Sequence, residues 1–194
     1  MLLEHTLEKF PITLNLRDGT PVTVRLIGKR DDARLHKFLL SVPEEERLFI
    51  KKPLADRAVV RDWCRHPDFE RNLPLMMLHG KKIIGEATLH QRIGGWKRHI
   101  GLISLLTHPN YRGRDVSKIL VAELIEIARS RGLRRLEAEV NGERKIALAV
   151  LSQLGFYKLL DLSDYVLDMK AVTHDYVLLG MDLKVDDEFA GVGD

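Results

Sequence analysis

The strongest chemical signal in the sequence is a basic, glycine-bearing turn between an apolar run and an amphipathic segment. The run Leu102–Thr107 has the apolar character of a buried strand, and Pro109 and Asn110 end it. The turn 111–117 opens directly into a predicted helix, whose apolar residues recur at the spacing of one buried face: Val116, Ile119, Leu120, Leu124, Ile127 and Ala128. A strand, a tight turn and a helix in this order aim free backbone N–H groups and a helix dipole at an anion. The sequence therefore predicts an anion-binding turn.

Asp115 in this turn has two opposed interpretations. Asp is among the preferred N-cap residues, so its carboxylate is expected to accept a hydrogen bond from the backbone N–H of residue 117 or 118. In that case the protein's own carboxylate occupies the anion site. In the other interpretation the turn still accepts a phosphate, and nearby cations either offset the charge of Asp115 or form a solvated basic edge. These cations are Arg112, Arg114 and Lys118.

A second candidate group lies on a predicted strand over residues 82–90. Strand alternation places four side chains on one face: Ile84, Glu86, Thr88 and His90. Glu86 is the candidate catalytic residue, a general base that acts through water, and the competing interpretation is a solvent-facing strand carboxylate. No metal is expected, because the spacing is too irregular for a metal site in the histidines His90, His99 and His108.

The composition excludes several classes of protein. The chain has 194 residues, which suggests one domain, and 45% of them are hydrophobic, enough for a core. The net charge of +3 comes without a concentrated basic stripe, so nucleic acid is not an expected partner. No apolar run approaches the roughly 20 residues of a membrane span, so no membrane association is expected. The single cysteine, Cys64, cannot form an internal disulfide, which favours a reducing, cytoplasmic setting.

Turn signals and hydrophobic periodicity predict an order of elements around these groups. Strands over 10–16 and 21–27 are joined by the hairpin turn Asp18-Gly19. Helical segments are expected from Asp31, around Leu48 and Phe49, and over 56–65. Strands over 75–79, 82–90 and 98–107 then form an antiparallel meander. A strand over 134–140 lies parallel to the preceding one, because a helical crossover separates the two.

The last part of the chain is predicted as a helix over 143–154, a strand over 156–160, an irregular segment over 161–175 and a closing strand over 176–183. We expect residues 1–183 to form a single domain and the acidic tail 184–194 to be disordered. The predicted fold class is α/β of the α+β type. A mixed, mostly antiparallel central sheet is flanked by helices and contains one parallel strand pair.

This order of elements resembles the GNAT superfamily of acetyl-CoA-dependent N-acetyltransferases over residues 22–183. The resemblance is most specific in the turn, where the family carries Arg or Gln, two variable residues, Gly, any residue, and Gly or Ala. The segment from His108 to Gly113 matches the residues that lead into this motif in the family. Leu154-Gly155-Phe156 resembles the family's closing helix and strand. The segment from Leu73-Pro74-Leu75 through Trp96 to Gly101 resembles bacterial members with protein-lysine or small-amine acceptors.

The resemblance implies transfer of an acetyl group from acetyl-CoA to an amine by direct attack. The cofactor pyrophosphate is expected on backbone N–H groups at the start of the helix. The pantetheine arm is expected to pair like an extra strand where the two parallel strands splay apart, with the N–H near Leu106 polarising the thioester carbonyl. Asn141 is expected to contact the cofactor arm, although a turn-forming role before Gly142 also explains it. The expected cofactor-binding residues are Leu105, Leu106, Thr107, Arg112, Gly113, Arg114, Asp115, Val116, Ser117, Lys118 and Asn141.

Four positions depart from the family pattern. Asp115 replaces the motif's Gly, and Ser117 replaces its Gly or Ala. Leu151 stands where a tyrosine often acts as general acid, and Leu102 stands where related bacterial sequences often carry a glutamate. The competing hypothesis is therefore a catalytically silent member of the same fold that binds acetyl-CoA weakly or not at all and serves as a binding or regulatory module. The sequence does not specify the amine acceptor, and it is compatible with a homodimer through edge strands.

Overall fold

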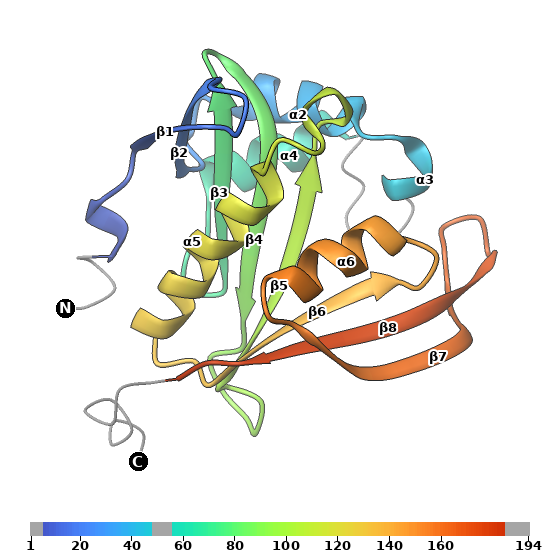
Figure 1. The fold of residues 1–194 in the computed structure, drawn as a ribbon. Coiled ribbons are helices and arrows are strands. Elements are labelled where there is room, and N and C mark those ends of the chain that lie inside the picture. Colours follow the sequence, from blue (N-terminus) through green and yellow to red (C-terminus); the bar gives the residue numbers. More distant parts are fainter. Residues whose placement is uncertain (1–5, 48–55, 185–194) are drawn as a thin grey trace.

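The computed structural model describes residues 6–47 and 56–184, and a single sheet runs through them (Figure 1). Within these residues the sheet has eight strands in the order β1-β2-β3-β4-β5-β6-β8-β7. The strands are β1 (Ile12–Asn15), β2 (Pro21–Leu26), β3 (Asn72–His79), β4 (Lys82–Gln91), β5 (Ile100–Thr107), β6 (Arg135–Asn141), β7 (Tyr157–Leu167) and β8 (Thr173–Asp182). Only β5 and β6 pair in parallel there, and this confirms the predicted mixed, mostly antiparallel sheet.

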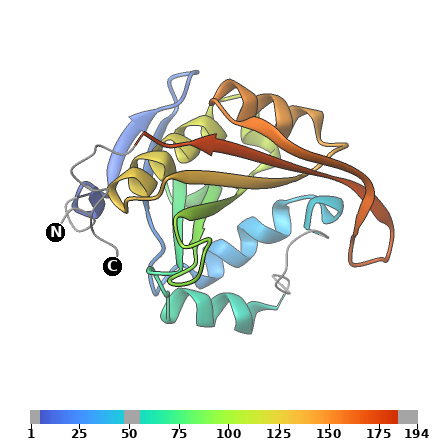
Figure 2. The same ribbon diagram turned by 90° about the horizontal axis from the view of Figure 1, so that it is seen from below.

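Helices cover both faces of the sheet. The helices α2 (Asp32–Ser41), α3 (Glu44–Arg47) and α4 (Arg57–Arg65) lie on one side, and α5 (Val116–Ser130) and α6 (Lys145–Gln153) lie on the other (Figure 2). Each side has its own hydrophobic core, one around α5 and one around α2 and α4. Because both faces are covered, β3 and β4 are buried along most of their length, with no alternation between buried and exposed residues. Of the described helices, none is long and apolar enough to cross a membrane.

The parallel strands β5 and β6 separate part of the way along their length. They pair from Ile100 with Arg135 to Ile103 with Ala138. Beyond this point β5 continues along β4 to Thr107, while β6 continues along β8 to Asn141. Figure 1 shows the two arrowheads diverging. The separation leaves a wedge, bordered by residues 104–107 of β5 and 139–141 of β6, and the predicted splay of the pair is confirmed.

A β-bulge in β4 changes one predicted side-chain orientation. The register between β3 and β4 shifts between Met77 and Leu78, so that Ile84 is an extra residue on β4. Ile84 therefore packs in the core around α5, whereas Met76, the cross-strand partner of Glu86, belongs to the core around α2 and α4. The predicted common face of Ile84 and Glu86 is wrong, because the bulge interrupts the strict alternation of the strand.

The C-terminal strands are longer than the sequence predicts. The segment 161–175 was expected to be irregular, but β7 and β8 form a hairpin that occupies most of it. The expectation is wrong because two register shifts in β7 and the left-handed backbone of Asp164 (φ 51°) break the alternation that identifies a strand. The helix expected around Leu48 and Phe49 and the tail 185–194 lie outside the described residues.

Candidate active site

The predicted anion-binding turn forms as a strand, a short 3-10 turn and a helix. β5 ends at Thr107, the 3-10 turn η1 (Pro109–Tyr111) follows, and α5 starts at Val116. Gly113 and Asp115 both have left-handed backbones, with φ of 73° and 68°. The hydroxyl groups of Thr107 and Ser117 lie 2.9 Å apart and join the end of the strand to the first turn of the helix. The candidate residues 105–118 are thus brought together around one helix N-terminus.

Asp115 does not cap α5 with its side chain, so of its two interpretations the one with a capping hydrogen bond is wrong. The residue occupies the N-cap position, but its side chain accepts no capping hydrogen bond. A capping Asp normally has an extended backbone, and the left-handed conformation of Asp115 does not provide that geometry. Its carboxylate instead lies 3.7 Å from the Lys118 ammonium group. The backbone N–H groups at the start of α5 are therefore not occupied by this carboxylate.

The basic side chains of the turn each have an acidic partner. Arg114 pairs with Asp18 at 3.0 Å and stacks over the ring of Tyr111, and Lys118 pairs with Asp115. Arg112 pairs with Glu46 of α3 at 2.6 Å. All three cationic side chains remain more than 40% exposed, so each stays within reach of a ligand.

Glu46 also binds a second arginine, on the other side of the wedge. Its other carboxylate oxygen lies 2.8 Å from the guanidinium group of Arg144, which directly precedes α6. Sequence reasoning missed both Glu46 and Arg144. Glu46 is 66 positions from Arg112 and 98 positions from Arg144 in the chain, so no local spacing could have indicated these contacts.

Glu86 is buried on β4, and its interpretation as a solvent-facing carboxylate is wrong. The residue is only 4% exposed, and its direct cross-strand neighbours are Met76 and Leu106. The hydroxyl group of Thr88 donates a hydrogen bond to one carboxylate oxygen. Burial raises the pKa of Glu86 to about 7, against the lowering effect of the Thr88 hydrogen bond. The carboxyl group is thus able to exchange a proton near neutral pH, beside the strand segment that borders the wedge.

Polar side chains continue from Glu86 along the same strand. His90 contacts the Asn72 carboxamide oxygen at 2.7 Å and the Ser104 hydroxyl at 3.0 Å, and Ser104 is the cross-strand partner of Thr88. Sequence alternation could have indicated this line of groups, since Thr88 and His90 were placed on the face of Glu86. The described residues contain no group of three side chains that could hold a metal ion.

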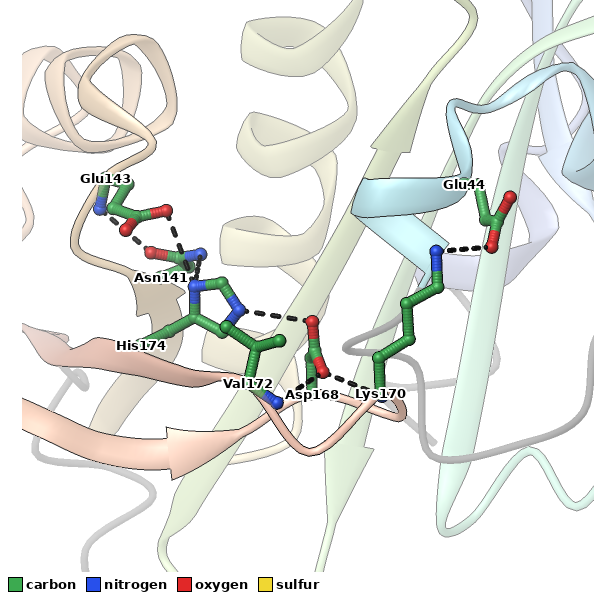
Figure 3. A network of polar contacts seen from close by, with 7 residues as sticks. All are labelled: Glu44, Asn141, Glu143, Asp168, Lys170, Val172 and His174. Carbon is green, nitrogen blue, oxygen red and sulfur yellow. Dashed lines mark hydrogen bonds and ion pairs between the residues drawn. The ribbon is translucent and has the colours of Figure 1, made fainter.

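Asn141 ends β6 at the other border of the wedge, and its side chain forms a turn. The Asn141 carboxamide oxygen accepts a hydrogen bond from the backbone N–H of Glu143 at 2.8 Å. Its nitrogen lies 3.5 Å from His174, which contacts Asp168 at 3.2 Å and Glu143 at 3.4 Å (Figure 3). The hydrogen bond to Asp168 and the interaction with Glu143 raise the pKa of His174. The turn-forming interpretation of Asn141 is confirmed, and its contact with a cofactor stays a prediction.

Two further positions that differ from the family pattern, Leu151 and Leu102, carry hydrophobic side chains. Leu151 is buried in the core around α5 and offers no proton donor there. Leu102 lies on β5 opposite His90. Neither position supplies an acid or a base. Among the candidate residues in the described part of the chain, Glu86 is the buried carboxyl group, and it lies opposite Leu106 at the border of the wedge.

Comparison with known proteins places this geometry in a family. The model of the acetyltransferase (GNAT) family matches residues 37–156. The GNAT domain of S. lividans PAT is 26% identical, with a TM-score of 0.74 over 89% of this chain and 97% of that one. The ribosomal-protein-S5-alanine acetyltransferase from Vibrio fischeri is 16% identical, with a TM-score of 0.74 over 92% and 98%. The protein yncA from Salmonella typhimurium, solved with its cofactor acetyl-CoA, is 15% identical, with a TM-score of 0.70 over 86% of this chain and 96% of that one.

The two less similar structures show the fold alone, whereas the family model shows membership of a family. Its match covers more than half of the chain and includes β4, β5, the turn and α5. The chain therefore belongs to the acetyltransferase (GNAT) family.

Proposed function

We propose that this protein transfers an acetyl group from acetyl-CoA to an amine of a small molecule or a protein. The observation that carries the proposal is the position of Glu86. It is a buried carboxyl group directly opposite Leu106, where β5 borders the wedge. The family membership supports acetyl transfer in general, and the solved relative with bound acetyl-CoA supports the choice of donor.

The two borders of the wedge and the turn are the proposed cosubstrate site. Backbone groups of residues 105–107 that point away from β4 have no strand partner in β6, so they are available to an extended ligand. The backbone N–H groups at the start of α5 suit a pyrophosphate, and Arg112, Arg114 and Lys118 add positive charge. When bound, acetyl-CoA supplies a thioester as the acyl donor.

Glu86 is the proposed general base. The amine must lose a proton as its nitrogen forms a bond to the acyl carbon and the carbon–sulfur bond breaks. Glu86 accepts that proton, either directly or through a water molecule, and a pKa of about 7 suits this role near neutral pH. Thr88 holds the carboxylate in place through its hydroxyl group. The thiol of coenzyme A is a good leaving group, so the absence of an acid at Leu151 is compatible with turnover.

The test is an acetylation assay with acetyl-CoA and a panel of small amines and lysine-containing peptides, in which the released thiol is measured. We expect turnover by the wild type, with kcat/KM rising with pH through an apparent pKa near 7. Glu86→Gln should lower kcat by about 100-fold or more and remove this pH dependence. Glu126→Gln, which changes an exposed carboxylate on α5, is the matched control and should be unchanged. Equal activity of Glu86→Gln and wild type would contradict the role of Glu86.

A catalytically silent binding protein is the second candidate function. It is favoured by the charge of Asp115 in the turn and by the hydrophobic Leu151. The two candidates differ in a simple measurement, because a bound cosubstrate raises the melting temperature. The silent protein is expected to bind acetyl-CoA weakly or not at all, so an unchanged melting temperature in acetyl-CoA, together with no turnover of any amine, would favour it.

A further inference from the structure

We propose that Arg112 and Arg144 form a phosphate-binding pair, and that Glu46 occupies this pair until the phosphates of the cosubstrate displace it. The inference rests on the proposed function, because it concerns the site at which acetyl-CoA is expected. It assigns a ligand contact to Arg144 and a competing role to Glu46.

The first argument is the geometry of the three side chains. One oxygen of the Glu46 carboxylate lies 2.6 Å from Arg112, and the other lies 2.8 Å from Arg144. The Glu46 side chain is only 13% exposed, while the two arginine side chains are 44% and 37% exposed. A single anionic group thus bridges two guanidinium groups that both remain accessible from outside.

The second argument is the position of the bridge relative to the wedge. Arg112 lies in the segment that follows β5, and Arg144 lies in the segment that follows β6. Because β5 and β6 are the strands that separate, the two arginines stand on opposite sides of the wedge. Glu46 reaches them from α3, so its carboxylate connects the two sides.

The third argument is that a phosphate suits this pair better than a carboxylate does. The pyrophosphate of acetyl-CoA as a whole carries more charge and more acceptor oxygens than the single Glu46 carboxylate, and arginine binds both anions through the same planar fork. Arg144 directly precedes α6, which begins at Lys145, and Arg112 lies four residues before α5, which begins at Val116. Neither helix has an acidic residue in its first turn, and the positive ends of both dipoles favour an incoming anion; at α5 this attraction is opposed by the charge of the N-cap residue, Asp115.

Displacement of Glu46 leaves α3 anchored from another side. Glu44, on the same short helix, pairs with Lys170 at the tip of the β7–β8 hairpin at 2.9 Å (Figure 3). This ion pair involves neither arginine of the bridge. Glu44 therefore provides a matched control for Glu46, with the same change of charge on the same helix.

The experiment compares acetyl-CoA affinity by calorimetry for the wild type and several variants. Glu46→Gln removes the competing charge and should tighten binding by about threefold to tenfold, whereas Glu44→Gln should leave it within twofold. Arg144→Gln should weaken binding by a similar factor, and Arg144→Lys should weaken it less, because Lys keeps the charge and loses the fork. In the double variant of Glu46→Gln and Arg144→Gln the gain should be lost.

Two further ligands separate this inference from the proposed function. Acetyl-pantetheine carries the thioester without the nucleotide phosphates, so Glu46→Gln should leave its affinity unchanged. Inorganic pyrophosphate carries phosphates alone, and it should raise the melting temperature of Glu46→Gln more than that of wild type. This last result supports the inference even where no amine is acetylated. If Glu46→Gln and Glu44→Gln behave alike toward acetyl-CoA and pyrophosphate, the inference is overturned, and wild-type turnover then still supports the proposed function.

Discussion

Asp115 adopts a backbone conformation that favours glycine, and it brings a negative charge to the proposed pyrophosphate site. Its φ of 68° lies in the left-handed region, which glycine enters without steric cost and which Asn and Asp tolerate better than most residues. The carboxylate lies near Lys118 rather than over the helix N-terminus. The turn therefore keeps its shape, and the effect of Asp115 on a phosphate is electrostatic.

This distinction predicts the behaviour of two substitutions. Asp115→Asn removes the charge and tolerates the left-handed backbone, so we expect it to bind acetyl-CoA more tightly, by about threefold to tenfold at low salt. Asp115→Gly should give a similar gain. Calorimetry at two salt concentrations measures both, and the gain should shrink at high salt. A gain seen with Gly alone would instead show that the side chain obstructs the site by its volume.

The sequence predicted individual residues where short-range patterns carry the information. Strand alternation placed Glu86 and Thr88 on one face, and the structure joins them by a hydrogen bond. The sequence left two interpretations of Asp115 open, and the side-chain cap is the wrong one, because amino-acid type alone does not reveal a left-handed backbone. The bridge through Glu46 could not be predicted at all, since its partners come from segments far apart in the chain.

At the scale of elements, the turn is positioned by the close approach of β4 and α5. Gly85 lies on β4 beneath the first turns of α5. A Cβ at this position would lie 2.6 Å from a methyl group of Val116 and 2.9 Å from one of Leu120. Because both neighbours are fully buried, they cannot move aside into solvent. The absence of a side chain at Gly85 thus allows α5 to present its N-terminus beside the end of β5.

Gly85→Ala should therefore disturb both the core and the turn. We expect a loss of about 1–3 kcal/mol in the free energy of unfolding, which is typical of overpacking in a core, together with weaker acetyl-CoA binding. Urea denaturation and calorimetry measure the two effects. Gly94→Ala is the control, because nothing lies within 4 Å of the added Cβ, and it should change stability by less than about 0.5 kcal/mol. Equal stability of Gly85→Ala and wild type would show that α5 can shift without cost.

The elements themselves followed from the sequence wherever periodicity is regular. The meander β3–β4–β5, the helix α5 and the parallel strand β6 were all predicted from apolar patterns and turn residues. The β7–β8 hairpin was not, because bulges in β7 and a left-handed Asp164 remove its alternation. Bulges in β4 and β7 are set by packing between strands, which a single strand's sequence does not record.

At the scale of the whole molecule, the sheet consists of two antiparallel parts joined by one short parallel contact. The strands β1 to β5 carry Glu86 and lead into the turn, and the strands β6, β8 and β7 form the other part, with Asn141 at the end of β6. The two parts meet where residues 100–103 pair with residues 135–138. The helix between β5 and β6 predicted that the two strands pair in parallel. The resemblance to the family implied that they separate along part of their length. The two parts are therefore expected to be linked more tightly when a ligand pairs with both borders of the wedge.

Hydrogen exchange tests this expectation. Acetyl-CoA should slow exchange of backbone amides on both borders, in residues 104–107 and 139–141, as well as in the turn 112–117. Only amides that do not already bond to β4 or β8 should respond, because the others are protected in the sheet. Inorganic pyrophosphate should protect the turn alone, since it lacks the arm that pairs with the strands. If acetyl-CoA also protected only the turn, the cosubstrate arm would not lie between β5 and β6, and Glu86 would be too far from the acyl group to act as its base.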